Sequence, residues 1–187
     1  MVIVACSVFE DELRAAMAEL NMTHEVLYIP STLDLDYDEL KSALESTLAQ
    51  AASRGEPIAL LYGTACHPEM TAIAERHGAK LLQNKNCIAM LLGEKLDELG
   101  EESNTYFLTR GWLKKWQELI RTGVAWSDTD ARLNFGVFDR TVALDSGTGD
   151  MSDEDLFDFF EYTQVPIEPY EISLERFKQQ LSELTGE

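Results

Sequence analysis

Basic residues are scarce in this sequence: 15 lysines and arginines stand against 34 aspartates and glutamates among 187 residues, a formal net charge of −19. A surface of that charge repels phosphate backbones and anionic headgroups, so neither nucleic acid nor a membrane surface is an expected partner. Long apolar runs are also missing, and none approaches the roughly 18 residues that a membrane span needs. The start, MVIVACSVF, has no basic segment ahead of its apolar one, so no targeting signal is visible. We therefore expect a cytoplasmic protein.

Cysteine, proline and glycine are few, at 3, 5 and 11 residues, which excludes disulfide-stapled, collagen-like and low-complexity chains. With 45% hydrophobic and 26% charged residues, the composition is that of a globular protein with a real core. The length predicts a single domain over residues 1–187, which folds alone or as an oligomer.

Short apolar runs alternate with segments of helical periodicity along the whole chain. The expected strands cover residues 2–5, 24–30, 57–62, 79–83, 104–108, 141–144 and 167–171. The expected helices cover residues 10–20, 38–53, 68–77, a segment around Gly93, 111–121, 153–162 and 174–184. This alternation predicts an α/β fold of three layers, Rossmann-like or flavodoxin-like, with a mostly parallel sheet covered by helices on both faces. Three strand-loop-helix-strand segments resemble one another, as internal repeats or simply as the regular construction of such a fold.

The three cysteines each lie in or just after the loop that leaves the carboxyl end of an expected strand. Open α/β sheets bind ligands at this edge, and the strand order 2-1-3-4 would bring Cys6, Cys66 and Cys87 together there. Three converging thiolates suit zinc or an iron-sulfur cluster, with His67 as a candidate fourth ligand. The alternatives are that each cysteine is a small buried hydrophobic residue and that His67 is an exposed residue preceding the helix that Pro68 opens.

Two further segments follow strand ends and could hold a small anionic ligand. The turn of Asp145, Ser146 and Gly147 offers backbone N–H groups and a hydroxyl, although a plain tight turn explains it equally well. Arg110 could bind a carboxylate or phosphate, or pair with one of the many acidic residues nearby. Trp112 directly follows this segment and is a candidate contact for the same ligand, or an ordinary packing residue.

Several motifs together resemble one protein family: an early strand ending in AC, then YGTAC, NCIAMLLG, TYFLTRGW and a late strand ending in DSG. The sequence is similar to domain-of-unknown-function family 1638, known chiefly from anaerobic bacteria and methanogenic archaea. The resemblance implies a link to corrinoid-dependent methyltransferase systems and thus to one-carbon metabolism. Its recurrent positions fall on Cys6, Cys66, Cys87, Gly111, Trp112, Asp145 and Gly147.

Two functions from different classes follow. The first is a protein that binds zinc or an iron-sulfur cluster through its cysteines and serves corrinoid-linked methyl transfer as an enzyme or accessory, with a corrinoid protein or methyltransferase as partner. The second is a metal-free module that binds a small anionic metabolite. No nucleophile and base can be paired from the sequence, so no residue is assigned a catalytic role.

Overall fold

The structure is a computed structural model that describes residues 1–186, apart from the side chain of residue 102. Within this range the strands form two sheets, both entirely parallel. The strands are β1 (Val2–Cys6), β2 (Glu25–Ile29), β3 (Ile58–Leu61), β4 (Ala79–Leu81), β5 (Thr105–Thr109), β6 (Arg140–Asp145) and β7 (Ile167–Glu171). Along the described residues, no helix has the length and apolar character needed to cross a membrane.

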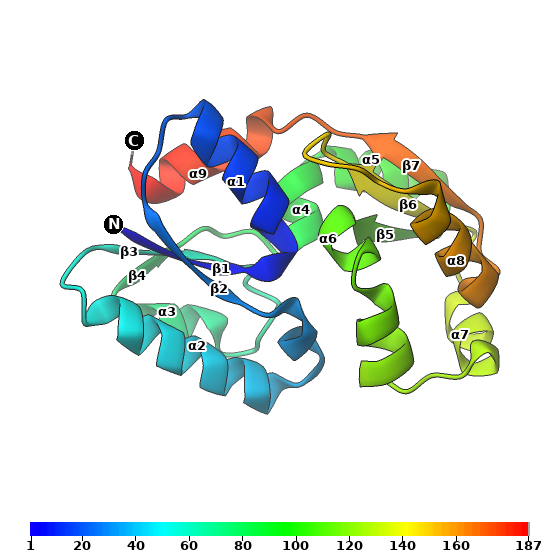
Figure 1. Ribbon diagram of the computed structural model, residues 1–187, viewed down its shortest axis with the longest axis horizontal. Coiled ribbons are helices and arrows are strands. Elements are labelled where there is room, and N and C mark those ends of the chain that lie inside the picture. Colours follow the sequence, from blue (N-terminus) through cyan, green and yellow to red (C-terminus); the bar gives the residue numbers. More distant parts are fainter. Residues whose placement is uncertain (187) are drawn as a thin grey trace.

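Helices connect the strands and cover the sheets (Figure 1). They are α1 (Glu10–Glu19), α2 (Tyr37–Ala52), α3 (Met70–Arg76), α4 (Cys87–Leu92), α5 (Lys95–Glu102), α6 (Arg110–Leu113), α7 (Asp128–Phe135), α8 (Asp153–Thr163) and α9 (Glu175–Thr185). Short 3-10 helices η1 (Ser7–Phe9) and η2 (Ser31–Leu35) follow β1 and β2, and a π-helix, η3 (Gln117–Gly123), follows α6.

The first sheet has the order β2-β1-β3-β4, the order under which the three cysteine loops were expected to lie together. All five residues of β1 are buried, because helices cover both faces of a parallel sheet and leave no side of the strand in water. Figure 1 shows α1 and α9 on one side of this sheet and α2 and α3 on the other. Leu40, Leu44 and Leu48 form the buried stripe of α2, at the spacing that places side chains on one helix face.

The expectation of one continuous sheet is wrong in one respect: the strands divide between two sheets. β5, β6 and β7 form a second sheet of their own, in that order. After β4 the chain does not return as a neighbouring strand but runs into α4, which packs against both β5 and α9. β5 therefore lies beside α4 and pairs with β6, not with β4. The α/β architecture of parallel strands between helix layers is confirmed.

The central strand of the second sheet, β6, is buried on both faces, and one face belongs to the core of the first sheet. Val142 and Leu144 of β6 lie in the same hydrophobic cluster as β1 and β3. Ala143, whose side chain points to the opposite face, lies in a second cluster with Leu108 and Phe159. The two halves of the molecule are thus joined by a shared core.

The expected helix over residues 111–121 is divided into α6 and the π-helix η3. Gly111 is required at the start of this segment, because a Cβ there would lie 2.3 Å from the carbonyl oxygen of Val8. That contact packs α6 against η1 and joins the two halves a second time. Helix α7 was not predicted, although a capping box of Ser127 and Asp130 marks its beginning.

Candidate functional site

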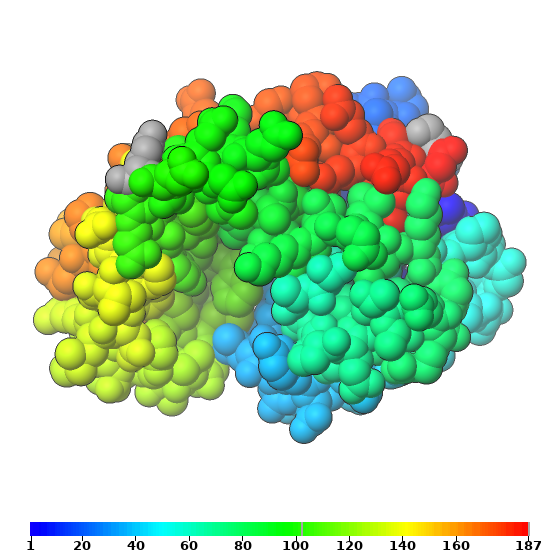
Figure 2. All heavy atoms as spheres, turned by 180° about the vertical axis from the view of Figure 1, so that it is seen from behind, coloured from blue at the N-terminus to red at the C-terminus, as the bar shows by residue number. Residues whose placement is uncertain are grey.

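A pocket of about 270 Å³ lies between the two sheets. Viewed from behind the molecule, Figure 2 shows a hollow between the half that carries α6 and α7 and the half that carries α2. One wall comes from loops that follow strands of the first sheet, and the other from β5 and α6 of the second. The lining residues are Asp34, Tyr37, Ala65, Cys66, Asn86, Cys87, Ile88, Tyr106, Phe107, Leu108 and Trp112.

The loops that carry Cys66 and Cys87 are hydrogen-bonded to each other. The backbone N–H of Thr64 donates to the carbonyl of Asn84 at 2.7 Å, and that of Ala65 donates to the carbonyl of Lys85 at 2.9 Å. Gly63 permits this approach, because a Cβ there would lie 2.5 Å from the Cα of Asn86. Gly63 in the motif YGTAC therefore has a physical role, because it lets the loop of Cys87 pass directly over the loop of Cys66.

Cys87 is the first residue of α4, and Asn86 is the N-cap of that helix. The side-chain oxygen of Asn86 accepts a hydrogen bond from the backbone N–H of Ala89 at 2.9 Å. This interaction fixes where α4 begins and therefore where Cys87 is placed. In the segment NKNC, Asn86 thus caps the helix and Cys87, the next residue, begins it.

Cys6 and Asp34 form the inner part of the site. Cys6 ends β1 and is buried, and its thiol donates to Oδ2 of Asp34 at 4.0 Å. The other carboxylate oxygen of Asp34, Oδ1, is buried without a hydrogen-bond partner, and the buried hydroxyl of Tyr62 lies beside the Cys6 thiol. An unpaired buried polar atom is costly, so Oδ1 of Asp34 marks a place where a further partner would be stabilising.

The electrostatics of the site disfavour negative charge. Burial raises the pKa of Cys6 well above its usual range, that of Cys66 to about 11 and that of Cys87 to about 12, and the carboxylate of Asp34 adds to the effect at all three. Burial also raises the pKa of Asp34 to about 7. With no cation beside them, the three thiols hold their protons at neutral pH, whereas Asp34 is about half ionised there and becomes a carboxylate as the pH rises further.

Among the described residues, no group of three or more histidine, cysteine, aspartate or glutamate side chains is arranged so that it could hold a metal ion. The structure brings Cys66 and Cys87 to one pocket and Cys6 to the Asp34 carboxylate that lines it. The donor atoms share one region, and ligation would require them to lose protons and draw closer.

His67 lies in a different environment from the one expected. It is 4% exposed, so the view of it as an exposed residue is wrong. Its Nδ1 accepts a hydrogen bond from the backbone N–H of Glu69 at 2.9 Å, just before α3 begins, and its ring contacts that of Tyr37 edge-on. His67, the candidate fourth ligand, does not line the pocket. Asp34 lines it instead, together with Cys66 and Cys87.

Arg110 is held by the protein itself. Its side chain is 5% exposed, Nη1 pairs with Asp11 at 2.6 Å, and Nε donates to the carbonyl of Asp150 at 3.1 Å. Lys114 binds the same carboxylate at 2.8 Å, and the pKa of Asp11 is lowered by these two cations despite partial burial. Arg110 therefore joins α1 to the second half of the molecule and is not among the pocket-lining residues.

The turn after β6 is likewise occupied. Ser146 donates to the buried carboxylate of Glu12 at 2.9 Å, and the backbone N–H of Gly147 donates to the side chain of its neighbour Asp145 at 2.9 Å. Burial raises the pKa of Glu12. The turn residues Asp145, Ser146 and Gly147 contact α1 and one another, and they do not line the cysteine pocket.

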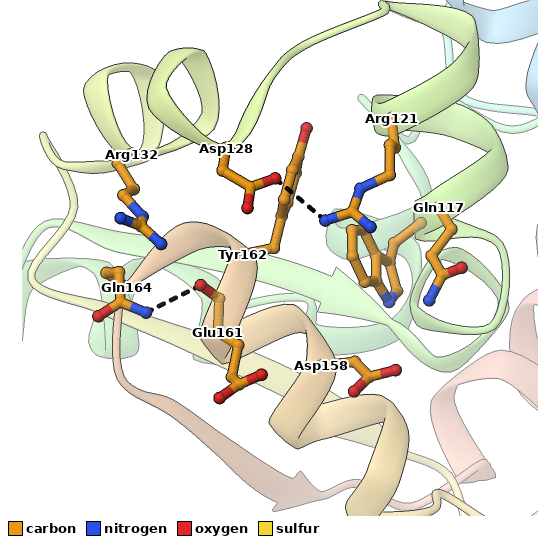
Figure 3. A pocket seen from close by; sticks show the side chains of 9 residues that line it. Gln117, Arg121, Asp128, Arg132, Asp158, Glu161, Tyr162 and Gln164 are labelled. Carbon is orange, nitrogen blue, oxygen red and sulfur yellow. Dashed lines mark hydrogen bonds and ion pairs between the residues drawn. The ribbon is translucent and has the colours of Figure 1, made fainter.

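The two tryptophans of the α6 region have different roles. Trp112 lines the pocket with Cys66 and Cys87. Trp116 packs in the second core, where the Arg121 guanidinium lies 5.6 Å from its ring centre and 4.7 Å from that of Tyr162. Figure 3 shows this second, polar pocket of about 310 Å³, in which Arg121 reaches Asp128 at 3.1 Å. Acidic and basic side chains both line it, and none of the residues singled out from the sequence does.

The sequence reasoning missed Asp34, Tyr62 and Tyr106. Burial raises the pKa of Tyr106 to about 12, with a further contribution from Cys87, so this phenol also lies near the thiols. A signal for Asp34 was present, because η2 follows the carboxyl end of β2 at the same sheet edge as the cysteine loops. Tyr62 directly follows β3 and reads as one more residue of an apolar strand.

Changing Gly63 to alanine should disturb both cysteine loops. The added Cβ would overlap the backbone of residue 86 and force the loops apart, at a cost of about 1–3 kcal/mol in the free energy of unfolding. Gly100→Ala is the matched control, because it meets no atom within 4 Å in an exposed helix and should be neutral or slightly stabilising. Denaturant unfolding measures both; equal stability of the two variants would contradict the close approach.

Comparison with known proteins identifies the family. The model of the family described as "Protein of unknown function (DUF1638)" matches residues 28–181. The chain belongs to this family. No curated protein and no solved structure matches it. The match includes Asp34, Cys66, Cys87 and Trp112 and begins after Cys6.

Proposed function

We propose that this DUF1638 protein binds zinc or an iron-sulfur cluster through Cys6, Cys66 and Cys87, with Asp34 as the fourth donor. The observation that carries the proposal is that Cys66 and Cys87 line one pocket with Asp34, whose Oδ2 accepts a hydrogen bond from the Cys6 thiol and whose Oδ1 is buried and unpaired. The four groups come from four separate segments, each following a different strand of the first sheet. Thiolates select soft metals, and three of them with one oxygen ligand complete a tetrahedral zinc site or hold a cluster.

The chemistry of the donor set fits such a group. The pKa values of all four groups are raised mainly by burial, so their ionised forms need a positive charge beside them. A metal ion would supply that positive charge, and Oδ1 of Asp34 would be one of its ligands. In this proposal His67 keeps its contact with the start of α3 and is not a ligand.

The wider role that we propose is that of a cytoplasmic enzyme or accessory protein in corrinoid-linked methyl transfer, as the family resemblance implies. A corrin macrocycle is far larger than a pocket of about 270 Å³, so the residues of this pocket do not fit a corrinoid. Any corrinoid would therefore be held by a partner protein. A metal-free anion site is less well supported, because Arg110 is paired with Asp11.

Titration of reduced, metal-free protein with Co²⁺ and then Zn²⁺ tests the proposal. Co²⁺ should give thiolate charge-transfer absorption that saturates at one ion per chain, and Zn²⁺ should displace it. Because the thiols are protonated at pH 7, binding should release about three protons per metal, and the affinity should rise with pH.

The matched control for this titration is His67→Ala, which removes a nearby metal-binding side chain that the proposal leaves out. It should bind Co²⁺ with an unchanged spectrum. Saturation without proton release, or without charge-transfer absorption, would place the metal on surface carboxylates and contradict the proposed site.

A further inference from the structure

The wall opposite the thiols is mostly aromatic. Tyr106, Phe107 and Trp112 form it together with Leu108, and Tyr37, which is 54% exposed, stands at the other side of the pocket. The ring of Tyr106 also packs against the second core, so Trp112 and Tyr37 are the rings most free to contact a ligand. Among the described residues that line the pocket there is no lysine, arginine or histidine, and Asp34 is the only acidic one. A pocket of this kind repels anions and accepts neutral or positively charged molecules.

We propose that this pocket binds a small organic cation of the quaternary ammonium class, held against the aromatic side chains with its charge toward Asp34. The negative faces of tryptophan and tyrosine rings attract such cations, and alkylated ammonium groups are the ligands that aromatic pockets recognise best. The carboxylate of Asp34, which lines the pocket, supplies the opposite charge.

The hydrogen-bonding groups of the pocket favour a fully alkylated nitrogen over a primary ammonium. A primary ammonium carries three N–H donors that need acceptors once water is removed. Beyond Asp34 the lining offers few, because the side-chain oxygen of Asn86 already accepts from Ala89. A quaternary nitrogen has no donor to satisfy, and its methyl groups suit the apolar contacts with Leu108 and Ile88.

This ligand does not depend on the proposed metal. In the metal-free protein the ionised Asp34 carboxylate balances the charge of the ligand. In the metal-bound protein a divalent ion with three thiolates and one carboxylate still carries a net charge of −2 in total, so the field in the pocket keeps its sign. The size of the pocket, about 270 Å³, limits the ligand to a small molecule.

Calorimetry with choline and its neutral isostere 3,3-dimethyl-1-butanol tests the inference at pH 8, on metal-free and zinc-treated protein. Choline should bind at least about tenfold more tightly than the alcohol, which has the same shape without the charge. Equal affinities would show a merely apolar pocket and overturn the proposal, as would the absence of choline binding.

Variants locate the ligand. Trp112→Leu should weaken choline binding by about tenfold, Trp112→Phe should do so by less, and Asp34→Asn should reduce the preference for choline over the alcohol. Tyr28→Leu, an exposed aromatic residue outside the pocket, is the control and should bind as the unmodified protein does. Unchanged binding in both Trp112 variants would overturn the assignment. The metal content of the same samples reports separately on the metal proposal, so either can fail without the other.

Discussion

Single replacement of Cys6, Cys66 or Cys87 by alanine should lower the metal retained by the purified protein to a small fraction of one ion or cluster per chain. Each replacement leaves two thiols and one carboxylate, an open and weaker ligand set, and the affinity should fall by at least about tenfold and in the extreme be lost. Metal analysis after gel filtration in the presence of a mild chelator measures the effect.

Val8→Ala is the matched control for these variants. Val8 is buried close to Cys6 in the chain, and its truncation removes apolar contacts without removing a donor atom. This variant should lose stability, by about 1 kcal/mol or somewhat more, and keep its metal. If the three alanine variants instead retain as much metal as Val8→Ala does, the cysteines are packing residues and the proposed site is wrong.

Asp34→Asn should stabilise the metal-free protein, and the gain should grow with pH. The pKa of Asp34 is raised to about 7, so between its ordinary value near 3.8 and 7 the folded protein keeps a proton that the unfolded chain has lost. Stability therefore falls as the pH rises through this window, and the penalty is complete above about pH 7. The benefit of the substitution should be about 2–3 kcal/mol larger at pH 8 than at pH 5.

Thermal unfolding at the two pH values checks this expectation, because each kcal/mol shifts the midpoint by about 2–4 °C in a protein of this size. Asp97→Asn, at an exposed position of α5, is the control and should show no comparable pH dependence. In the metal-loaded protein the sign should reverse, since the substitution would then remove a ligand. A pH-independent effect in the metal-free protein would show that Asp34 is ionised without cost.

The sequence was sufficient to predict the strands of the first sheet and the edge at which the cysteine loops lie, because apolar runs mark the strands and parallel strands expose their carboxyl ends on one side. The order 2-1-3-4 was assumed as a common arrangement, and the structure has it. The position of Gly63 beside the backbone of residue 86 could not be read in the same way, because it depends on two loops more than 20 residues apart.

The sequence could not predict which groups the charged and polar side chains pair with. Arg110 pairs with Asp11, 99 residues earlier, and Ser146 pairs with Glu12, 134 residues earlier. No local pattern distinguishes such an arginine from one that awaits an anionic ligand. The division into two sheets was hidden for a related reason, because β5 reads as a strand whichever neighbour it pairs with.

Metal and acid-labile sulfide analysis of protein purified without oxygen, together with its visible spectrum, tests the central claim most directly. The account predicts either about one zinc ion per chain without sulfide and without visible absorption, or iron and sulfide in matching amounts with the brown absorption of a cluster. Protein that is free of metal and sulfide under these conditions, with all three thiols reduced and titratable, would contradict it.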